Sequence, residues 1–115
     1  MAGNWCFEIE QGATFSRVLT WKDSAGDPID LTGYTARMQL RQYKSSGAVI
    51  LELTTGADGR IALGGAAGTI TLEVDADDTA EVTTDEGVYD LELVNGDVVT
   101  RLLEGQWKLN KEVTR

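Results

Sequence analysis

Apolar and polar residues alternate along most of this chain of 115 residues, with the two-residue period of a strand that has one buried face. The alternation is cleanest over residues 34–42, where every second residue from Tyr34 to Leu40 is apolar and the residues between them are polar or charged. Similar segments, separated by turn signals about every 8–12 residues, favour an all-β fold. The predicted strands occupy residues 4–10, 14–22, 34–42, 49–53, 61–63, 69–74, 87–94, 97–104 and 107–113.

The strongest short-range signal lies at Asn95-Gly96, which separates two alternating runs. Asn-Gly favours a two-residue type I′ turn, because both central residues of that turn need positive φ. The sequence therefore predicts a hairpin, with an ion pair between residues that face each other across it. In the predicted register the facing pairs are Leu93 and Val98, Tyr89 and Leu102, and Asp90 and Arg101.

Residues 75–82 interrupt the strand pattern with three aspartates. Aspartates stabilise the start of a helix, so we predict a single helical turn capped by Asp75. No helical period persists long enough to cover a parallel sheet. The pattern is therefore typical of an immunoglobulin-like antiparallel β-sandwich with one short helical turn. The length allows one hydrophobic core, and we expect one domain over residues 1–115.

The chain has a formal net charge of −9, with 19 acidic and 10 basic residues. This charge argues against nucleic acid and anionic membranes as partners, because both attract clustered Lys and Arg. The sequence contains neither a recognisable signal peptide nor an apolar run of membrane-spanning length, which favours a soluble protein made in a reducing cytosol. Cys6 is the only cysteine. Its place in an apolar strand predicts a small buried thiol.

No histidine is present, which removes the commonest general base and metal ligand. The cluster of Asp75, Asp77 and Asp78 could suggest calcium, but it lacks the glycine and distal glutamate of an EF-hand loop. Glu8 and Glu10 share one face of a strand, yet nothing positions either carboxylate against a substrate. We therefore predict a protein that is not an enzyme, with no catalytic residue and no cofactor or metal site.

The three tryptophans, Trp5, Trp21 and Trp107, each fall on the apolar phase of a predicted strand. Core packing is therefore the expected role of these side chains. In the alternative, one of them is exposed and stacks on a sugar ring. The chain would then be a carbohydrate- or host-surface-binding module.

With the strands placed, the chain resembles a small β-sandwich family encoded in tailed-phage genomes. It is similar to the N-terminal domain of phage baseplate upper proteins and to short phage structural proteins that stand alone. The resemblance runs from about Glu10 to Val113 and concerns turns and core positions. The segments that carry it are residues 11–15 (QGATF), 19–23 (LTWKD), 28–39 (PIDLTGYTARMQ), 68–72 (GTITL), 76–80 (ADDTA) and 87–93 (GVYDLEL).

The resemblance implies a virion structural protein that is made in the bacterial host cytoplasm and located in the phage particle. Its role would be that of a tail or baseplate adaptor, or of a decoration module, present in several copies. The implied partners are other phage structural proteins and further copies of this chain. Assembly would use surface complementarity and strand pairing at an exposed sheet edge.

The last strand is predicted to be the partner interface. It lies close to a chain end with no covering helix, so it would offer unpaired N–H and C=O groups to a neighbour. It is also the most basic stretch of an acidic chain, which would favour an acidic partner surface. The alternative is a solvated last strand that only closes the sheet. The candidate interface residues are Trp107, Lys108, Lys111, Val113 and Arg115.

Overall fold

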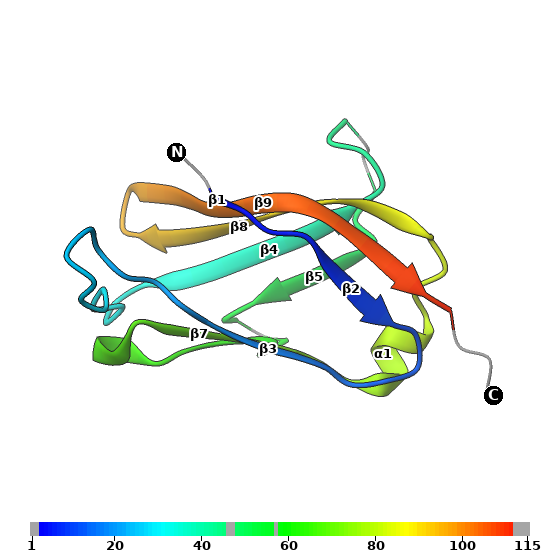
Figure 1. The fold of residues 1–115 in the computed structure, drawn as a ribbon, viewed down its shortest axis with the longest axis horizontal. Helices are drawn as coiled ribbons and strands as arrows, with labels where there is room; N and C mark the ends of the chain where they lie inside the picture. The colour runs from blue at the N-terminus through cyan, green and yellow to red at the C-terminus, as the bar shows by residue number, and fades with distance from the viewer. Residues whose placement is uncertain (1–2, 46–47, 57, 112–115) are drawn as a thin grey trace.

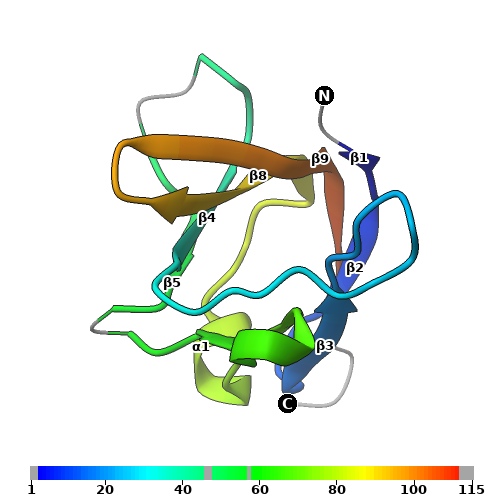
Figure 2. The same ribbon diagram turned by 90° about the vertical axis from the view of Figure 1, so that its left-hand side faces the viewer.

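The computed structural model describes residues 3–45, 48–56 and 58–111, which fold into two β-sheets packed face to face (Figures 1 and 2). The predicted all-β sandwich is confirmed, with one short α-helix and a 3₁₀ turn at Gly65–Ala67. Sheet A has six strands: β1 (Gly3–Asn4), β2 (Phe7–Glu10), β4 (Thr35–Arg41), β5 (Leu51–Thr54), β8 (Glu86–Asn95) and β9 (Val98–Asn110). Sheet B has three: β3 (Phe15–Thr20), β6 (Ile61–Leu63) and β7 (Thr69–Val74).

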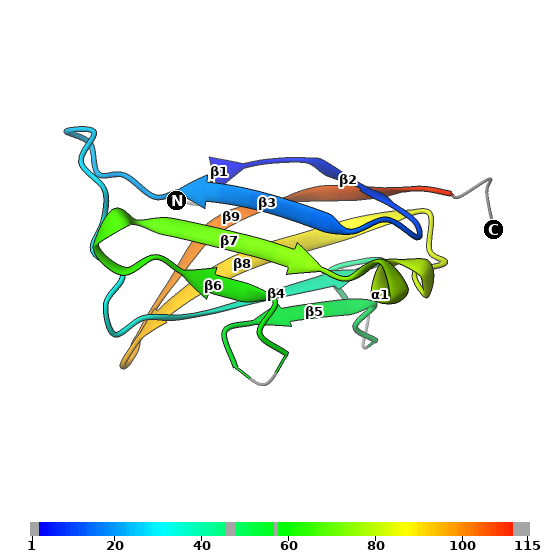
Figure 3. The ribbon, with the colours of Figure 1, turned by 90° about the horizontal axis from the view of Figure 1, so that it is seen from below.

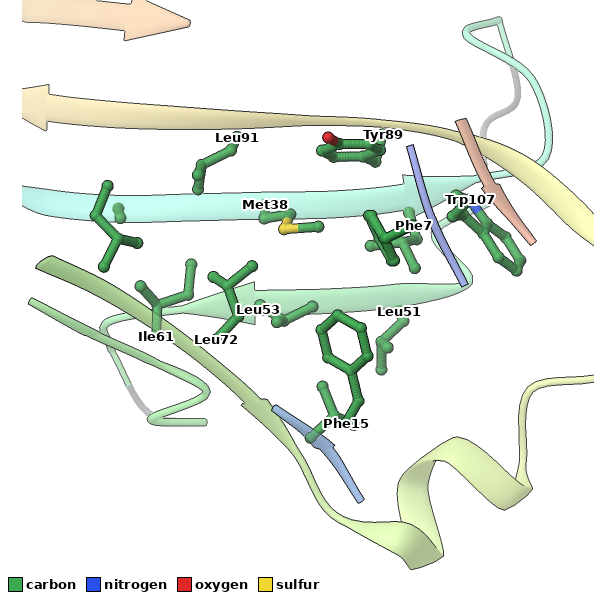
Figure 4. Packing of buried hydrophobic residues seen from close by; sticks show 14 of the residues in the cluster. Phe7, Phe15, Met38, Leu51, Leu53, Ile61, Leu72, Tyr89, Leu91 and Trp107 are labelled. Atoms are coloured by element: carbon green, nitrogen blue, oxygen red, sulfur yellow. The ribbon is translucent and has the colours of Figure 1, made fainter. Parts of the chain in front are cut away.

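Apolar side chains from the inner faces of both sheets form one hydrophobic cluster (Figure 4). The alternation predicted this arrangement well in β4, where Ala36, Met38 and Leu40 are buried. A cluster of aromatic side chains connects the N-terminal strands to the rest of the core. The ring of Phe7 lies 5.3 Å from that of Phe15 and 4.8 Å from that of Tyr89, measured between centroids.

The N-terminal segment belongs to both sheets. In sheet A, β1 and β2 pair in parallel with β9, and the chain then turns and enters sheet B as β3. Sheet A is therefore mixed, and its strand order is β1-β9-β8-β4-β5 with β2 also beside β9. The segment is held closely, because Tyr89 Oη donates to the carbonyl of Trp5. A Cβ on Gly105 would lie 2.3 Å from that same carbonyl oxygen, so glycine allows this close approach.

The predicted hairpin is present, but its turn and register were predicted wrongly. Asn95 is the Cα partner of Val98, so the two loop residues are Gly96 and Asp97. Gly96 has φ of 60° and no non-glycine residue in the described ranges has positive φ, which fits a type II′ turn. A register shift at Leu91 and Glu92 then places one extra residue in β9. The facing pairs are therefore Leu93 and Thr100, Tyr89 and Gly105, and Asp90 and Glu104.

The predicted helical turn is α1 (Ala76–Ala80), and Asp75 occupies the N-cap position. The Asp75 side chain makes no capping hydrogen bond, contrary to prediction. The helix is instead connected to the sandwich through Thr79, which is fully buried. Its hydroxyl donates to the carbonyl of Ala13 (2.8 Å) and accepts from the N–H of Gly12 (3.1 Å). One buried hydroxyl thus joins α1 to the turn between β2 and β3.

Cys6 is exposed, so the prediction of a buried thiol was wrong. The residue lies between β1 and β2, where the side chains of Trp5 and Phe7 point inward instead. In an alternating segment, two apolar neighbours that face the core place the residue between them on the outside.

Candidate functional site

The C-terminal strand is not a free edge. β9 pairs with β8 on one side as far as Lys108, and with β1 and β2 on the other side at Leu103–Glu104 and Trp107–Asn110, so partners lie along both edges of its C-terminal half. Trp107 is fully buried, and its Nε1 donates to the carbonyl of Arg41 (3.3 Å). The prediction that this strand offers an open edge was therefore wrong for Trp107–Asn110, and Trp107, a candidate interface residue, is buried as the apolar phase of the strand predicts. The predicted interface residues Val113 and Arg115 lie outside the described residues.

The two described lysines of the predicted interface are exposed, but acidic residues of the same chain lie beside them. Lys108 has Glu8 on one neighbouring strand and Glu86 on the other as its Cα partners. Lys111 Nζ lies 3.0 Å from Asp85 Oδ1. Much of the positive charge expected to attract a partner is thus balanced within the chain.

The real edges of the two sheets differ in how far they are protected. At β5, the side chains of a neighbouring loop take the outward backbone groups: Asp58 Oδ1 accepts from the N–H of Thr54 (3.0 Å). Arg60 Nη1 donates to the carbonyl of Glu52 (2.7 Å), and its Nη2 bonds Asp78 Oδ2 (2.8 Å). Covering an edge in this way blocks strand addition, so β5 is closed.

Two further edges are poor pairing sites for other reasons. The outer side chains of β2 are Glu8 and Glu10, which place two carboxylates along a four-residue strand. Charged side chains on an edge discourage another strand from pairing there. β6 has only three residues, too few for an extended ladder.

β3, with six residues, is the longest edge strand; it lies beside β7 (Figure 3), and no described strand pairs with its other, open edge. Trp21 N–H donates to the carbonyl of Gly68 (2.9 Å), which continues the β3–β7 ladder. Because backbone groups alternate in direction along an antiparallel strand, those of Ser16, Val18 and Thr20 point away from β7. Val18 is 63% exposed, an unusual position for a large apolar side chain on an edge.

The outer face of sheet B, which begins at β3, is almost uncharged. Apart from Val18 and the charged Glu73, its residues are small or hydroxylic. All of them are exposed except Thr69 and Thr71, which are half-buried. In a chain of net charge −9, such a face is the one that another acidic protein approaches with least repulsion. The outward side chains are Ser16, Val18, Thr20, Ala62, Thr69, Thr71 and Glu73.

The outer face of sheet A is polar and largely paired within itself. Arg37 Nε lies 2.8 Å from Glu92 Oε1, and Arg101 lies between Asp90 (3.5 Å) and Glu104 (3.6 Å). The predicted ion pair of Asp90 and Arg101 is thus formed, although the two residues are not directly opposite each other. This face holds a shallow hollow of about 240 Å³. It is lined by Gln39, Arg41, Lys44, Val88, Tyr89, Asp90, Arg101 and Glu104.

Asp90 is a titratable group in the lining of this hollow whose pKa is shifted. Partial burial raises the pKa of its carboxyl above the ordinary value of 3.8, and the charges of Glu92 and Glu104 raise it further. Arg101 and Lys44 act in the opposite direction but do not cancel these effects. The acidic pair of Asp90 and Glu104 could not be found from the sequence, because it depends on the extra residue in β9.

We expect Asp90→Asn to stabilise the protein more at pH 7 than at pH 3. A carboxyl whose pKa is raised by folding stabilises the fold below its unfolded pKa, and this contribution is lost as the pH rises through the folded pKa. Asparagine cannot ionise, so the variant does not lose this stability as the pH rises to 7. The effect should stay below about 1 kcal/mol, because the side chain is exposed enough for solvent screening. Urea denaturation at the two pH values checks this, and an equal effect at both would contradict it.

The tryptophans lie mainly in the core, as predicted. Trp107 is fully buried, and Trp5 and Trp21 are partly buried and pack against the hydrophobic cluster. Trp21 meets the ring of Tyr34 edge-on at 6.1 Å between centroids. A sugar-stacking role for Trp5 or Trp21 stays a hypothesis, and a tryptophan-fluorescence titration with sugars tests it.

The described ranges contain no group of three or more Cys, Asp or Glu residues arranged to hold a metal ion. No helix among them is long and apolar enough to cross a membrane. Among the described residues, the open edge of β3 with its exposed Val18 is the feature with the clearest capacity for recognition. No protein-family model and no curated protein sequence matches this chain.

Proposed function

We propose that this chain is a non-enzymatic structural protein of a tailed-phage particle, which acts as an adaptor or decoration module in several copies. The observation that carries the proposal is the open edge of β3, with its outward backbone groups and its exposed Val18. An extended strand of a neighbour can add to such an edge through main-chain hydrogen bonds. The resemblance of the turn and core segments to phage β-sandwich proteins is the reason for proposing that this pairing takes place in a phage particle.

The arrangement of the other edges supports this proposal. β5 is covered by Asp58 and Arg60, and β2 carries Glu8 and Glu10. A monomer that only had to avoid aggregation would gain from the same protection at β3. The unprotected edge is therefore better explained as a binding surface for a neighbouring strand than as a feature without a role.

The test measures incorporation into particles. A tagged copy of the chain is expressed while the phage that encodes it is produced, and mass spectrometry quantifies the tag in purified particles. We expect Val18→Lys to reduce incorporation by about tenfold, the effect of losing roughly 1.4 kcal/mol of binding free energy. Absence of the wild-type chain from particles would disprove the proposed function.

Val98→Lys is the matched control. Val98 is 65% exposed and Val18 is 63% exposed, so both substitutions add a charge at an equally accessible valine in a strand. Val98 lies beside the β8–β9 turn of sheet A, away from β3. Incorporation should therefore be normal for Val98→Lys, and an equal loss in both variants would exclude β3 as the specific contact.

A further inference from the structure

We infer that the occupant of the β3 edge is the β3 strand of a second copy of this chain, so that sheet B continues across a two-fold axis at Val18. The inference rests on the proposed assembly function and names the partner at that edge. It is carried by the backbone register of β3, by its side chains and by the distribution of charge.

The backbone of β3 is complementary to itself. The outward-facing residues Ser16, Val18 and Thr20 are evenly spaced around Val18. When two such strands pair antiparallel, Val18 lies opposite its counterpart and Ser16 lies opposite Thr20 of the other copy. Each outward N–H then faces a carbonyl, because all these residues are at hydrogen-bonding positions. If the two-fold axis passed through any other residue of β3, some of these outward N–H and C=O groups would have no partner.

The side chains tolerate this register. On the outer face, Val18 meets Val18 of the second copy, and β-branched pairs across strands are favourable. On the inner face, Arg17 lies opposite Leu19, so no like charges face each other directly. Arg17 Nη1 now donates to the carbonyl of Ser16 (2.8 Å) and must release it for the outermost pair to form. The guanidinium can remain over the ring of Phe15, 4.8 Å from its centroid.

Charge favours this edge over the others for self-association. Two copies of net charge −9 repel each other, and the repulsion is smallest where acidic residues are absent. β3 contains no acidic residue, whereas β2 carries Glu8 and Glu10. Association through β3 should therefore strengthen as salt screens the remaining repulsion between the copies.

Disulfide trapping of the purified full-length chain tests the register. The exposed Cys6 is first replaced by Cys6→Ser, and Val18→Cys is then introduced. Directly opposed hydrogen-bonded residues have Cα atoms about 5.5 Å apart, within the range of about 4.4–6.8 Å that a disulfide accepts. We expect a disulfide-bonded dimer to form at least about tenfold faster than for the control Thr20→Cys, which would lie opposite Ser16 rather than its own counterpart.

Equal trapping rates for the two cysteine variants, or no dimer from Val18→Cys, would overturn the inference. Sedimentation equilibrium of Val18→Pro gives a cysteine-free measurement, since proline removes an outward N–H and leaves the β3–β7 ladder intact. This variant should be monomeric and folded by circular dichroism, while the wild type should dimerise more strongly at higher salt. Incorporation into particles that depends on Val18, without dimerisation, would reject the second copy and keep the assembly function with another partner.

Discussion

Gly87→Ala is expected to lower the free energy of unfolding by about 3 kcal/mol, at the upper end of the cost of overpacking a core. Gly87 is buried near the start of β8, directly opposite Trp107. A Cβ at this position would lie 2.1 Å from the carbonyl oxygen of Arg41 and 2.7 Å from Nε1 of Trp107. The first contact is with backbone, so relief requires β8 to move away from the strand that carries Arg41.

Gly56→Ala is the control for this prediction. Of the described residues, the Cβ added at Gly56 meets Thr54 Oγ1 alone, at 3.4 Å, and the backbone there does not have positive φ. Alanine should thus be neutral or stabilise by up to about 1 kcal/mol through the unfolded state. Urea denaturation at 25 °C measures both variants. A loss below about 1 kcal/mol for Gly87→Ala would show that the strands have room that the structure does not indicate.

The strands of this fold could be predicted because each one alternates between a buried and an exposed face. Phe15, Met38 and Leu72 lie on the inward phase in the sequence and are buried in the structure. The helix after β7 could be placed for a similar reason, since a group of aspartates breaks the alternation there. These are local properties, so a single sequence contains them.

The hairpin register could not be predicted from the turn residues alone. Type I′ and type II′ turns both use glycine, and Gly96 is suitable for either, in different positions of the loop. The extra residue in β9 depends on packing against β8 and has no local sequence signal. As a result, Leu91 and Leu103 are partners where the turn predicted another pairing.

The alternation of apolar and polar residues also could not predict which strands lie beside one another. Alternation predicts that Trp107 and Leu109 lie on the buried face of their strand. It does not predict that the N-terminal strands lie beside β9. The last strand looked like an edge because the chain ends near it. The edge of β3 is open instead, because β2 pairs with β9 and not with β3.

Trp107→Ala is expected to lower the free energy of unfolding by about 3–5 kcal/mol, the usual cost of truncating a fully buried aromatic side chain. Trp107 has no exposed surface and packs between Gly87 of β8 and Phe7 of β2, its partners in the sheet. Truncation also removes the indole N–H that the carbonyl of Arg41 now accepts from. Both effects arise within one chain and do not require a partner.

This prediction distinguishes a core residue from the interface residue that the sequence suggested. An exposed interface tryptophan would change stability little on truncation, and its fluorescence would respond to a partner. For a core residue, the wild-type chain should show short-wavelength emission that Trp107→Ala loses, together with the fall in stability. Trp21→Ala is the control, because Trp21 is only partly buried, and it should cost about 1–3 kcal/mol. Equal losses in the two variants would contradict the central place of Trp107 between β2 and β8.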